Sequence, residues 1–259
     1  GRQVAALEAS LGVTIFERVG RGLVLTEAGA QLVAHLRDMG EAAEKVAMAA
    51  AGQSQSIDGV VRVTVSDVYA AHVLPPLLTQ LRARAPGLVV EVAAVNSISD
   101  LIRREADIAI RHVRPDQDGL IARRCADSAA YIYGAPAYFE REGRPNSAAD
   151  FARAVFVGAF EGNDIFIAEL NRRGVPVGPA NFPWATQSGV TGWEWVRQGL
   201  CLGAMVDVVA RRTPGVEVAL PSLEPIPVST WLVTHRELRT SARIRLVFDV
   251  LAEALSRRG

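Results

Sequence analysis

The stretch LGVTIFERVGRGLVLTEAG, residues 11–29, has the pattern of a short β-hairpin placed between two helices. Before the hairpin, Val4, Leu7 and Leu11 recur at helical spacing, and Gly12 is a residue type that commonly ends a helix. VTIFER and LVLT are strand candidates, and the glycines of the intervening VGRG permit a tight turn. The pattern therefore predicts a hairpin that carries Arg18 and Arg21 near its tip.

Residues 27–52 are predicted to form one long helix. Thr26 suits the N-cap position, and Glu27 suits the positive end of the helix. Its apolar residues recur every 3.5 residues, which is the period of a helix packed along a partner helix. They are Leu32, Leu36, Met39, Ala43, Val46 and Ala50. A helix that lies on its own domain remains an alternative, but the narrow seam favours dimerisation through the first five of these residues.

Beyond the polar linker QSQSIDG, residues 53–59, the pattern becomes that of an α/β protein. Strands and helices alternate from residue 60 to residue 111 at a spacing typical of parallel βαβ units. The helix SDLIRREA, residues 99–106, belongs to this series. A second α/β set begins near residue 131, and a strand at 228–235 and a helix at 241–255 follow it. The two lobes are either consecutive or threaded, with the chain returning to the first lobe at its end.

Composition narrows the functional classes. The 259 residues carry 28 basic and 28 acidic side chains, and 49% are hydrophobic, so we expect a full core and only local contacts with nucleic acid. Two distant cysteines and four histidines show no metal-ligand spacing, and we predict neither a metal nor a cofactor. Neither a leader nor a long apolar span is evident, which predicts a soluble, cytoplasmic protein. The chain carries no GxSxG, P-loop, HExxH or GxGxxG motif, so we do not expect an enzyme.

The order of these segments resembles that of LysR-type transcriptional regulators. The resemblance rests on the opening hairpin and long helix, then VRVTVS, LPPLLTQLRARAPGLVVEV, ADIAIR, YGAPAYFE, VRQGLCLGAMV and RIRLVFDVLAEAL. It implies a winged helix-turn-helix segment over residues 1–27, a linker and dimerisation helix over 28–55, and an effector-binding domain over 56–259. The last is expected to resemble a type 2 periplasmic binding protein, with lobe I at about 58–131 and 236–259 and lobe II at about 132–235. The resemblance also implies a homodimer or homotetramer that binds operator DNA and a small effector.

The DNA-contacting residues are inferred from this resemblance. The family's first two helices precede what this chain contains, because the chain opens inside what resembles the recognition helix. We therefore expect these residues alone to bind operator DNA poorly. Arg2 and Gln3, at the start of the helix, and Arg18 and Arg21, on the wing, are the predicted contacts. The alternative is that these exposed side chains are simply solvated.

The predicted effector site lies where strands end, because ligands of α/β sheets bind at the carboxyl ends of strands and near helix N-termini. Three pairs of residues follow predicted strands and are assigned to the site: Ser66 and Asp67, Ser97 and Ile98, and Gln187 and Ser188. Ser97 also fits a capping box in SISD, which is a purely structural reading. Asp67 disfavours an anionic effector unless it is paired.

Charged and aromatic residues complete the predicted site. Arg111, at the end of DIAIR, could pair with Asp67 or with the ligand. Phe160 and Trp184 are expected in loops that face the cleft, whereas the tryptophans of the helix GWEWVRQG are expected in the core. This composition predicts an organic acid or an aromatic effector. A small-solute-binding protein of the same fold without a DNA function is the alternative interpretation.

Overall fold

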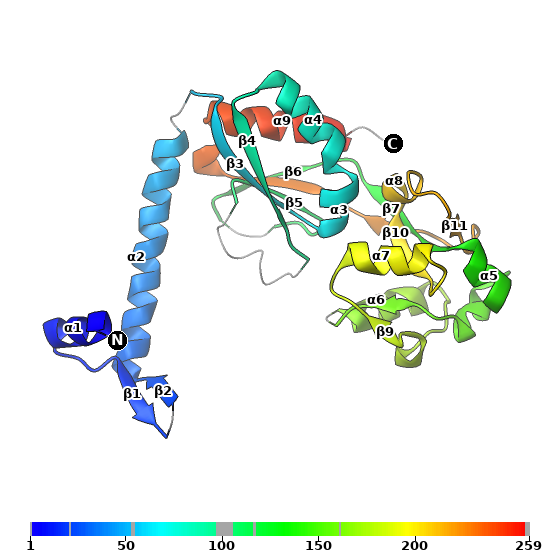
Figure 1. Cartoon of the computed structure of the whole chain (residues 1–259), viewed down its shortest axis with the longest axis horizontal. Coiled ribbons are helices and arrows are strands. Elements are labelled where there is room, and N and C mark those ends of the chain that lie inside the picture. Colours follow the sequence, from blue (N-terminus) through cyan, green and yellow to red (C-terminus); the bar gives the residue numbers. More distant parts are fainter. Residues whose placement is uncertain are drawn as a thin grey trace. The chain divides into compact units, whose positions relative to one another are not determined.

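The structure is a computed structural model, and the chain divides into two compact units, residues 1–54 and residues 55–259 (Figure 1). It describes residues 2–20, 22–52, 55–96, 106–115, 118–160 and 162–256. The second unit consists of two α/β lobes. In the described part of the chain, none of the helices has the length and apolar character needed to cross a membrane.

The first unit contains the predicted helix, hairpin and long helix. In chain order, its elements are α1 (Arg2–Leu11), β1 (Phe16–Val19), β2 (Gly22–Leu25) and α2 (Glu27–Gly52). The antiparallel hairpin pairs Phe16 with Leu25 and Val19 with Gly22, so the turn falls where the glycines predicted it. Gly12, at φ 68°, follows the end of α1 and donates its N–H to the carbonyl of Glu8.

Hydrogen bonds from two side chains tie α1, the hairpin and α2 together. The Glu8 carboxylate accepts the backbone N–H groups of Ile15 and Phe16, at 2.7 and 3.1 Å. The Thr26 hydroxyl donates to the carbonyl of Thr14 at 2.6 Å and accepts the N–H of Gly29 at 2.9 Å. Thr26 is therefore the N-cap of α2, as predicted, and it fixes the start of that helix against the segment before the hairpin.

The predicted seam of α2 is largely exposed in the single chain. Leu36, Met39 and Val46 are 49%, 68% and 72% exposed, Ala43 is exposed, and Leu32 is half-buried. Apolar side chains at a 3.5-residue period thus lie along one side of the helix, and within the described part of this unit no element covers Leu36, Met39 or Val46. Their burial in a dimer stays a prediction.

The first lobe of the second unit is built on a five-stranded sheet of order β4-β3-β5-β13-β6. Its strands are β3 (Gly59–Val65), β4 (Leu88–Ala94), β5 (Ile108–Arg111), β6 (Leu120–Arg124) and β13 (Trp231–His235). Strand β3 runs parallel to β4 and β5, as the βαβ pattern predicted, whereas β13 is antiparallel to β5 and β6. Helices α3 (Asp67–His72), α4 (Leu74–Arg84) and α9 (Ala242–Ser256) pack with this sheet.

The second lobe is arranged around β7, which pairs antiparallel with three other strands. Its strands are β7 (Ser128–Gly134), β8 (Val157–Gly158), β9 (Trp184–Ala185), β10 (Gly203–Val206), β11 (Glu217–Val218) and β12 (Ile226–Val228). Its helices are α5 (Pro136–Glu142), α6 (Asn163–Arg172), α7 (Gly189–Arg197) and α8 (Asp207–Ala210), with 3-10 turns at Ala148–Arg153 and Pro179–Asn181. Phe151, Phe156 and Leu170 are fully buried at its centre.

The chain crosses between the lobes twice, near residues 125–127 and 229–230, where Cys125 donates its N–H to the carbonyl of Thr230. The predicted boundary between lobes is therefore corrected in two places. Strand β13 was expected in the second lobe but lies inside the first sheet, because Leu232 and Val233 are buried between two neighbouring strands. Strand β7 was placed partly in lobe I, but it belongs to the second lobe from Ser128 onward.

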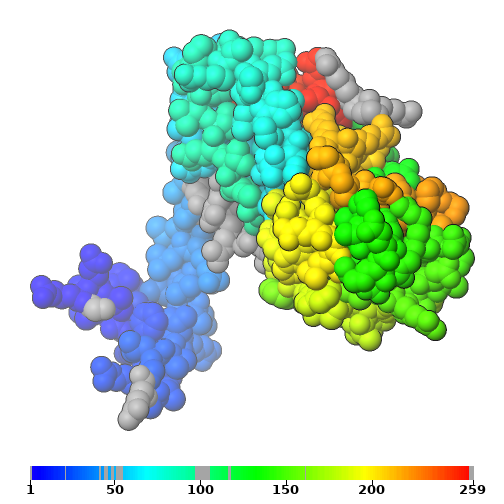
Figure 2. Space-filling view, turned by 45° about the vertical axis from the view of Figure 1, so that its right-hand side comes forward, coloured from blue at the N-terminus to red at the C-terminus, as the bar shows by residue number. Residues whose placement is uncertain are grey.

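Several short elements were not predicted, namely α3, α5, α8, β6, β11 and β12. The predicted helix at 99–106 lies almost wholly outside the described residues. Figure 2 shows the surface of α3 and α4, in cyan, adjoining the yellow surface of α7 in the other lobe, and α3 and α7 are in contact.

The two cysteines are unpaired and buried, one near a crossing between lobes and one in the second lobe. Burial raises the pKa of the Cys201 thiol to about 12. Burial is also the main cause of the raised pKa of Cys125. Among the described residues, no cluster of three His, Cys, Asp or Glu side chains could hold a metal ion.

Candidate ligand-binding cavity

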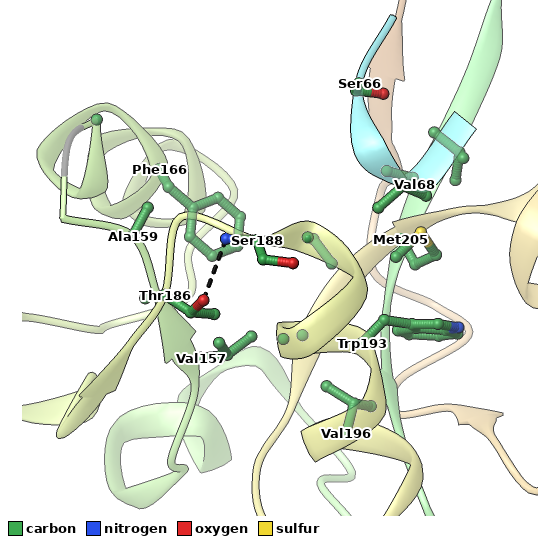
Figure 3. Close-up of a pocket in the computed structure, with 18 of the residues that line it drawn as sticks. Ser66, Val68, Val157, Ala159, Phe166, Thr186, Ser188, Trp193, Val196 and Met205 are labelled. Carbon is green, nitrogen blue, oxygen red and sulfur yellow. Dashed lines mark hydrogen bonds between the residues drawn. The ribbon is translucent and has the colours of Figure 1, made fainter. Parts of the chain in front are cut away.

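A cavity of about 360 Å³ lies between the two lobes (Figure 3). The first lobe contributes the segment that follows β3 and the residue that follows β5. The second lobe contributes β8, the segment after β9, β10 and the facing sides of α6 and α7. The first-lobe wall consists of Ser66, Val68, Tyr69 and His112, and the larger second-lobe side chains are Val157, Phe166, Thr186, Trp193, Val196 and Met205.

The first-lobe wall includes two rings that are in contact with each other. Tyr69 and His112 meet edge to face, with ring centroids 4.7 Å apart, and Nδ1 of His112 lies 3.4 Å from the carbonyl oxygen of Ser229. Burial lowers the pKa of His112 and raises the pKa of Tyr69. Both shifts favour the neutral forms, so this wall presents no positive charge at neutral pH.

The second-lobe wall is apolar and held in place from behind. The indole N–H of Trp193 donates to the hydroxyl of Thr213 at 3.2 Å, and its ring meets the edge of Tyr133 at 5.7 Å. Phe166 packs against Phe182 with centroids 6.0 Å apart. Two aromatic side chains from separate helices are therefore fixed at the cavity, which suits a ligand with an apolar body.

A carboxylate from the first lobe reaches the N-terminus of α7 in the second. Oδ2 of Asp67 accepts the Ser188 hydroxyl at 2.8 Å and the Val190 N–H at 3.2 Å. Ser188 is itself the N-cap of α7, because its oxygen accepts the N–H of Thr191 at 3.1 Å. We call the two bonds to Asp67 the Asp67 bridge. It satisfies one free N-terminal N–H of α7, that of Val190, and places negative charge at the positive end of the helix dipole.

A second polar contact joins the lobes beside this bridge. The side chain of Asn96 accepts the N–H of Asp67 at 3.1 Å through Oδ1 and donates from Nδ2 to the carbonyl of Gln187 at 2.8 Å. On the second-lobe side, the N–H of Ser188 donates to the Thr186 hydroxyl at 3.1 Å, the bond drawn in Figure 3. Both lobes thus share one hydrogen-bonded network at the edge of the cavity.

Comparison with known proteins agrees with this two-lobed architecture. The family model of the LysR substrate binding domain matches residues 54–256, which is most of the chain. The chain belongs to the LysR family of transcriptional regulators. The model described as bacterial regulatory helix-turn-helix protein, lysR family, matches residues 1–30. Members of this family are regulators and not enzymes.

Curated LysR relatives match parts of the chain. CrgA of Neisseria meningitidis serogroup C is 35% identical over 155 residues, which cover 58% of this chain and 50% of the relative. DmlR of Escherichia coli is 24% identical over 260 residues, covering 97% of this chain and 83% of the relative. The chain spans about half the length of the first of these relatives.

Solved structures share the LysR fold at low sequence identity. Full-length AphB of Vibrio cholerae has a TM-score of 0.67 at 18% identity, covering 96% of this chain and 87% of that chain. CrgA of Neisseria meningitidis has a TM-score of 0.66 at 23% identity, covering 99% of this chain and 88% of that chain. These likenesses establish the fold alone. At identities below 25%, they do not identify a ligand or a DNA target for this chain.

Within this LysR fold, the structure brings together part of the predicted effector site. Ser66 and Ser188 line the cavity, and Asp67 is bonded to Ser188. Gln187 takes part through its backbone carbonyl only. Ser97 and Ile98 lie outside the described residues. The rule that sites follow strand ends therefore located the edge of the cavity, whereas ligand contact by these residues stays a prediction.

Three further predicted residues belong neither to the lining of the cavity nor to the hydrogen-bonded network at its edge. Phe160 is 73% exposed in the segment after β8, and Trp184, on β9, is 41% exposed. The Arg111 guanidinium turns back to β3, where it donates to the carbonyl of Thr64 at 3.1 Å and to its hydroxyl at 3.2 Å. Burial lowers the pKa of Arg111 to about 10. Of the two partners suggested for Arg111, Asp67 or the ligand, the structure shows no pairing with Asp67, because both side chains have other partners.

The residues that sequence analysis missed are mainly apolar. Val68 and Tyr69 lie on α3, which was not predicted, although Ser66 followed by Asp67 is a helix-start signal. His112 directly follows Arg111, the last residue of β5, and no motif or spacing marked it as a site residue. Trp193 was assigned to the core, and it is indeed only 3% exposed, but one side of it faces the cavity.

The predicted DNA contacts occupy exposed positions in the first unit. Arg2 and Gln3 are exposed on α1, and Arg18 is exposed on β1. Arg21 lies outside the described residues. These side chains are available to phosphate groups, and their contact with DNA stays a prediction.

Proposed function

We propose that this chain forms part of a transcriptional regulator in which a small effector bound between the lobes controls DNA binding. The observation that carries the proposal is the 360 Å³ cavity, whose walls come from both lobes. A ligand in such a cavity contacts both lobes at once. Its affinity therefore depends on how the lobes are arranged, which is the condition for shifting a conformational equilibrium.

The proposed division of labour follows the family. Residues 1–27 contact operator DNA through Arg2, Gln3, Arg18 and Arg21. Residues 28–55 dimerise through the exposed seam of α2, and residues 56–259 bind the effector. The exposure of Leu36, Met39 and Val46 supports this assignment, because such side chains gain free energy when a second copy covers them. The active species is a homodimer or homotetramer that works in the cytoplasm, where its DNA is.

The proposed effector is a small organic molecule with an aromatic or apolar body. The support is that Trp193 and Phe166, fixed on the second lobe, line the same cavity as Tyr69 of the first lobe. An aromatic effector would stack on or against these rings, and the hydroxyls of Ser66 and Thr186 would bind a polar substituent.

A thermal-shift screen of small aromatics and organic acids against the full chain tests effector binding. A binder at about 100 times its Kd stabilises the folded state by about 2.7 kcal/mol, and the melting temperature rises accordingly. Ala159→Trp fills the cavity from the segment after β8 and should abolish the shift. Ala168→Trp, at an exposed position of α6, is the matched control and should retain it. A shift that survives Ala159→Trp would mean that the ligand binds elsewhere.

A further inference from the structure

We infer that the cavity selects an uncharged ligand, because the carboxylate of Asp67 already occupies the place at the N-terminus of α7 where a ligand anion would bind. The inference rests on the proposed effector function and specifies the chemical class of the effector. Asp67 thereby becomes a specificity-determining residue.

The first argument is the occupancy of the helix terminus. A free helix N-terminus is a ready anion site, because its first N–H groups have no partner within the helix. Here Oδ2 of Asp67 accepts both the Val190 N–H and the Ser188 hydroxyl, while Oδ1 accepts the Val68 N–H at 2.7 Å. Two of the donors that would bind a ligand carboxylate, the Val190 N–H and the Ser188 hydroxyl, are therefore already engaged.

The second argument is the close fit of this carboxylate against α7. A Cβ added at Gly189 would lie 3.0 Å from Oδ1 of Asp67 and 2.6 Å from Cγ2 of Val68. Glycine at the first position of α7 thus lets the helix terminus and the Asp67 side chain approach each other. Little space remains for a second carboxylate between them.

The third argument is the absence of a compensating cation at the cavity. Among the described residues of its lining, none is arginine or lysine. The guanidinium of Arg111 is engaged with Thr64, and burial lowers the pKa of His112 and keeps its ring neutral. An anionic ligand would give up its water, gain no opposite charge and lie near the charge of Asp67.

A neutral ligand meets none of these costs. The apolar walls accept its body, and the hydroxyl of Ser66, which makes no capping bond to α3, is available to a polar group. A cationic ligand would compete with three donors for the oxygens of Asp67. An alcohol, amide or phenol therefore fits the described lining better than a carboxylate or an amine does.

Three probes of one shape but different charge test the inference: benzyl alcohol, benzoate and benzylamine. Their Kd values are measured by titration calorimetry at pH 7.5 on the full chain. In the wild-type protein, benzyl alcohol should bind at least about tenfold more tightly than either ion. Asp67→Ala frees the donors of Ser188 and Val190. The Kd of benzoate divided by the Kd of benzyl alcohol should therefore fall at least about tenfold.

Two further variants control this experiment. Asp67→Asn keeps an acceptor and the size of the side chain while removing the charge, and it should narrow the ratio as well. Asp164→Ala removes a carboxylate from an exposed position in the first turn of α6, and it should leave the ratio unchanged.

The outcomes separate the ligand class from the proposed function. If the wild-type protein binds benzoate or benzylamine as tightly as benzyl alcohol, the ligand class is wrong, whereas the cavity remains a ligand site. If Asp164→Ala lowers the ratio of the two Kd values as much as Asp67→Ala does, the proposed role of Asp67 is also wrong. If no probe binds any variant, the ligand class and the use of the cavity as an effector site both fail.

Discussion

The two units of this chain differ in how far they bury their apolar residues. In the second unit, the lobes enclose side chains such as Phe156, Leu232 and Val247, each fully buried. Among the described residues of the first unit, Ile15 is the buried apolar side chain, and most leucines and valines of α1, the hairpin and α2 remain exposed. The same amphipathic patterns therefore produce a packed core in one unit and unoccupied contact surface in the other.

This difference indicates what holds each unit together. The second unit depends on burial of apolar area, which is the main stabilising contribution in a domain of its size. The described part of the first unit depends on a few hydrogen bonds, above all those of Glu8 and Thr26, and on any partner that covers its exposed side chains. Substitutions that disturb packing, association or capping should consequently affect the two units differently.

The largest effect is expected from Phe156→Ala in the second lobe. Phe156 is fully buried between Phe151 and Phe182, so truncation should lower the free energy of unfolding of the second unit by about 3–5 kcal/mol. Urea unfolding followed by tryptophan fluorescence measures the change. Phe160→Ala removes an exposed ring and should change the value by less than about 0.5 kcal/mol. Equal losses would contradict the described core.

Association through α2 should be broken by Leu36→Arg. A charge in the apolar seam should raise the dissociation constant of the dimer at least about 100-fold, equivalent to about 2.7 kcal/mol. Solution scattering over a concentration series measures the mass. Asp38→Ala, on the opposite side of α2, should leave the mass unchanged. If Leu36→Arg and the wild-type protein have the same mass at every concentration, α2 does not form the dimer contact.

Glycine-to-alanine substitutions at two positions of α2 should change stability in opposite directions. A Cβ at Gly29 would lie 2.2 Å from the carbonyl oxygen of Ile15, so Gly29→Ala should destabilise the first unit by about 1–3 kcal/mol. At Gly40 nothing lies within 4 Å, and Gly40→Ala should stabilise the helix by about 0.5–1 kcal/mol. Amide hydrogen exchange of residues 15–30 measures the first change, and exchange of residues 36–44 measures the second. Equal protection in the two variants would refute the close contact at Ile15.

The smallest effect is a pH dependence confined to the second unit. Because burial lowers the pKa of His112, the unfolded chain takes up a proton at pH 6.5 before the folded chain does. Stability should be complete above pH 6.5 and fall below it, by less than about 1.4 kcal/mol per pH unit. His112→Gln should flatten the slope of stability against pH between pH 7.5 and 5.5, whereas His35→Gln, at an exposed position of α2 outside the second unit, should not. Parallel slopes would exclude His112 as the cause.

The elements that could be predicted from the sequence are those with strong local signals. The hairpin of residues 16–25 has glycines at its turn, α2 has an N-cap at Thr26, and the parallel strands β3, β4 and β5 are apolar runs separated by helices. The six residues of α3 are too few to show a helical period. The position of β13 depends on which strands it pairs with, and this is a long-range property that local patterns do not contain.

The cavity was predictable at its polar edge but not at its walls. Ser66, Asp67 and Ser188 follow strands, so a topological rule located them. The apolar wall residues, such as Trp193 and Met205, have the same pattern as core residues, because one side chain can face both the core and the cavity. Arg111 misled the prediction, since a charge near a strand end does not reveal whether the backbone of a neighbouring strand has already engaged it.

The buried thiols give each half of the second unit its own chemical reporter. The thiolate is the form that attacks alkylating reagents, and a pKa near 12 at Cys201 leaves almost none of it at neutral pH. Modification of Cys125 or Cys201 by iodoacetamide therefore requires that the structure around that residue opens first. The labelling rate at each site would measure how often the crossing between lobes and the interior of the second lobe become exposed, and whether a bound ligand slows both openings together.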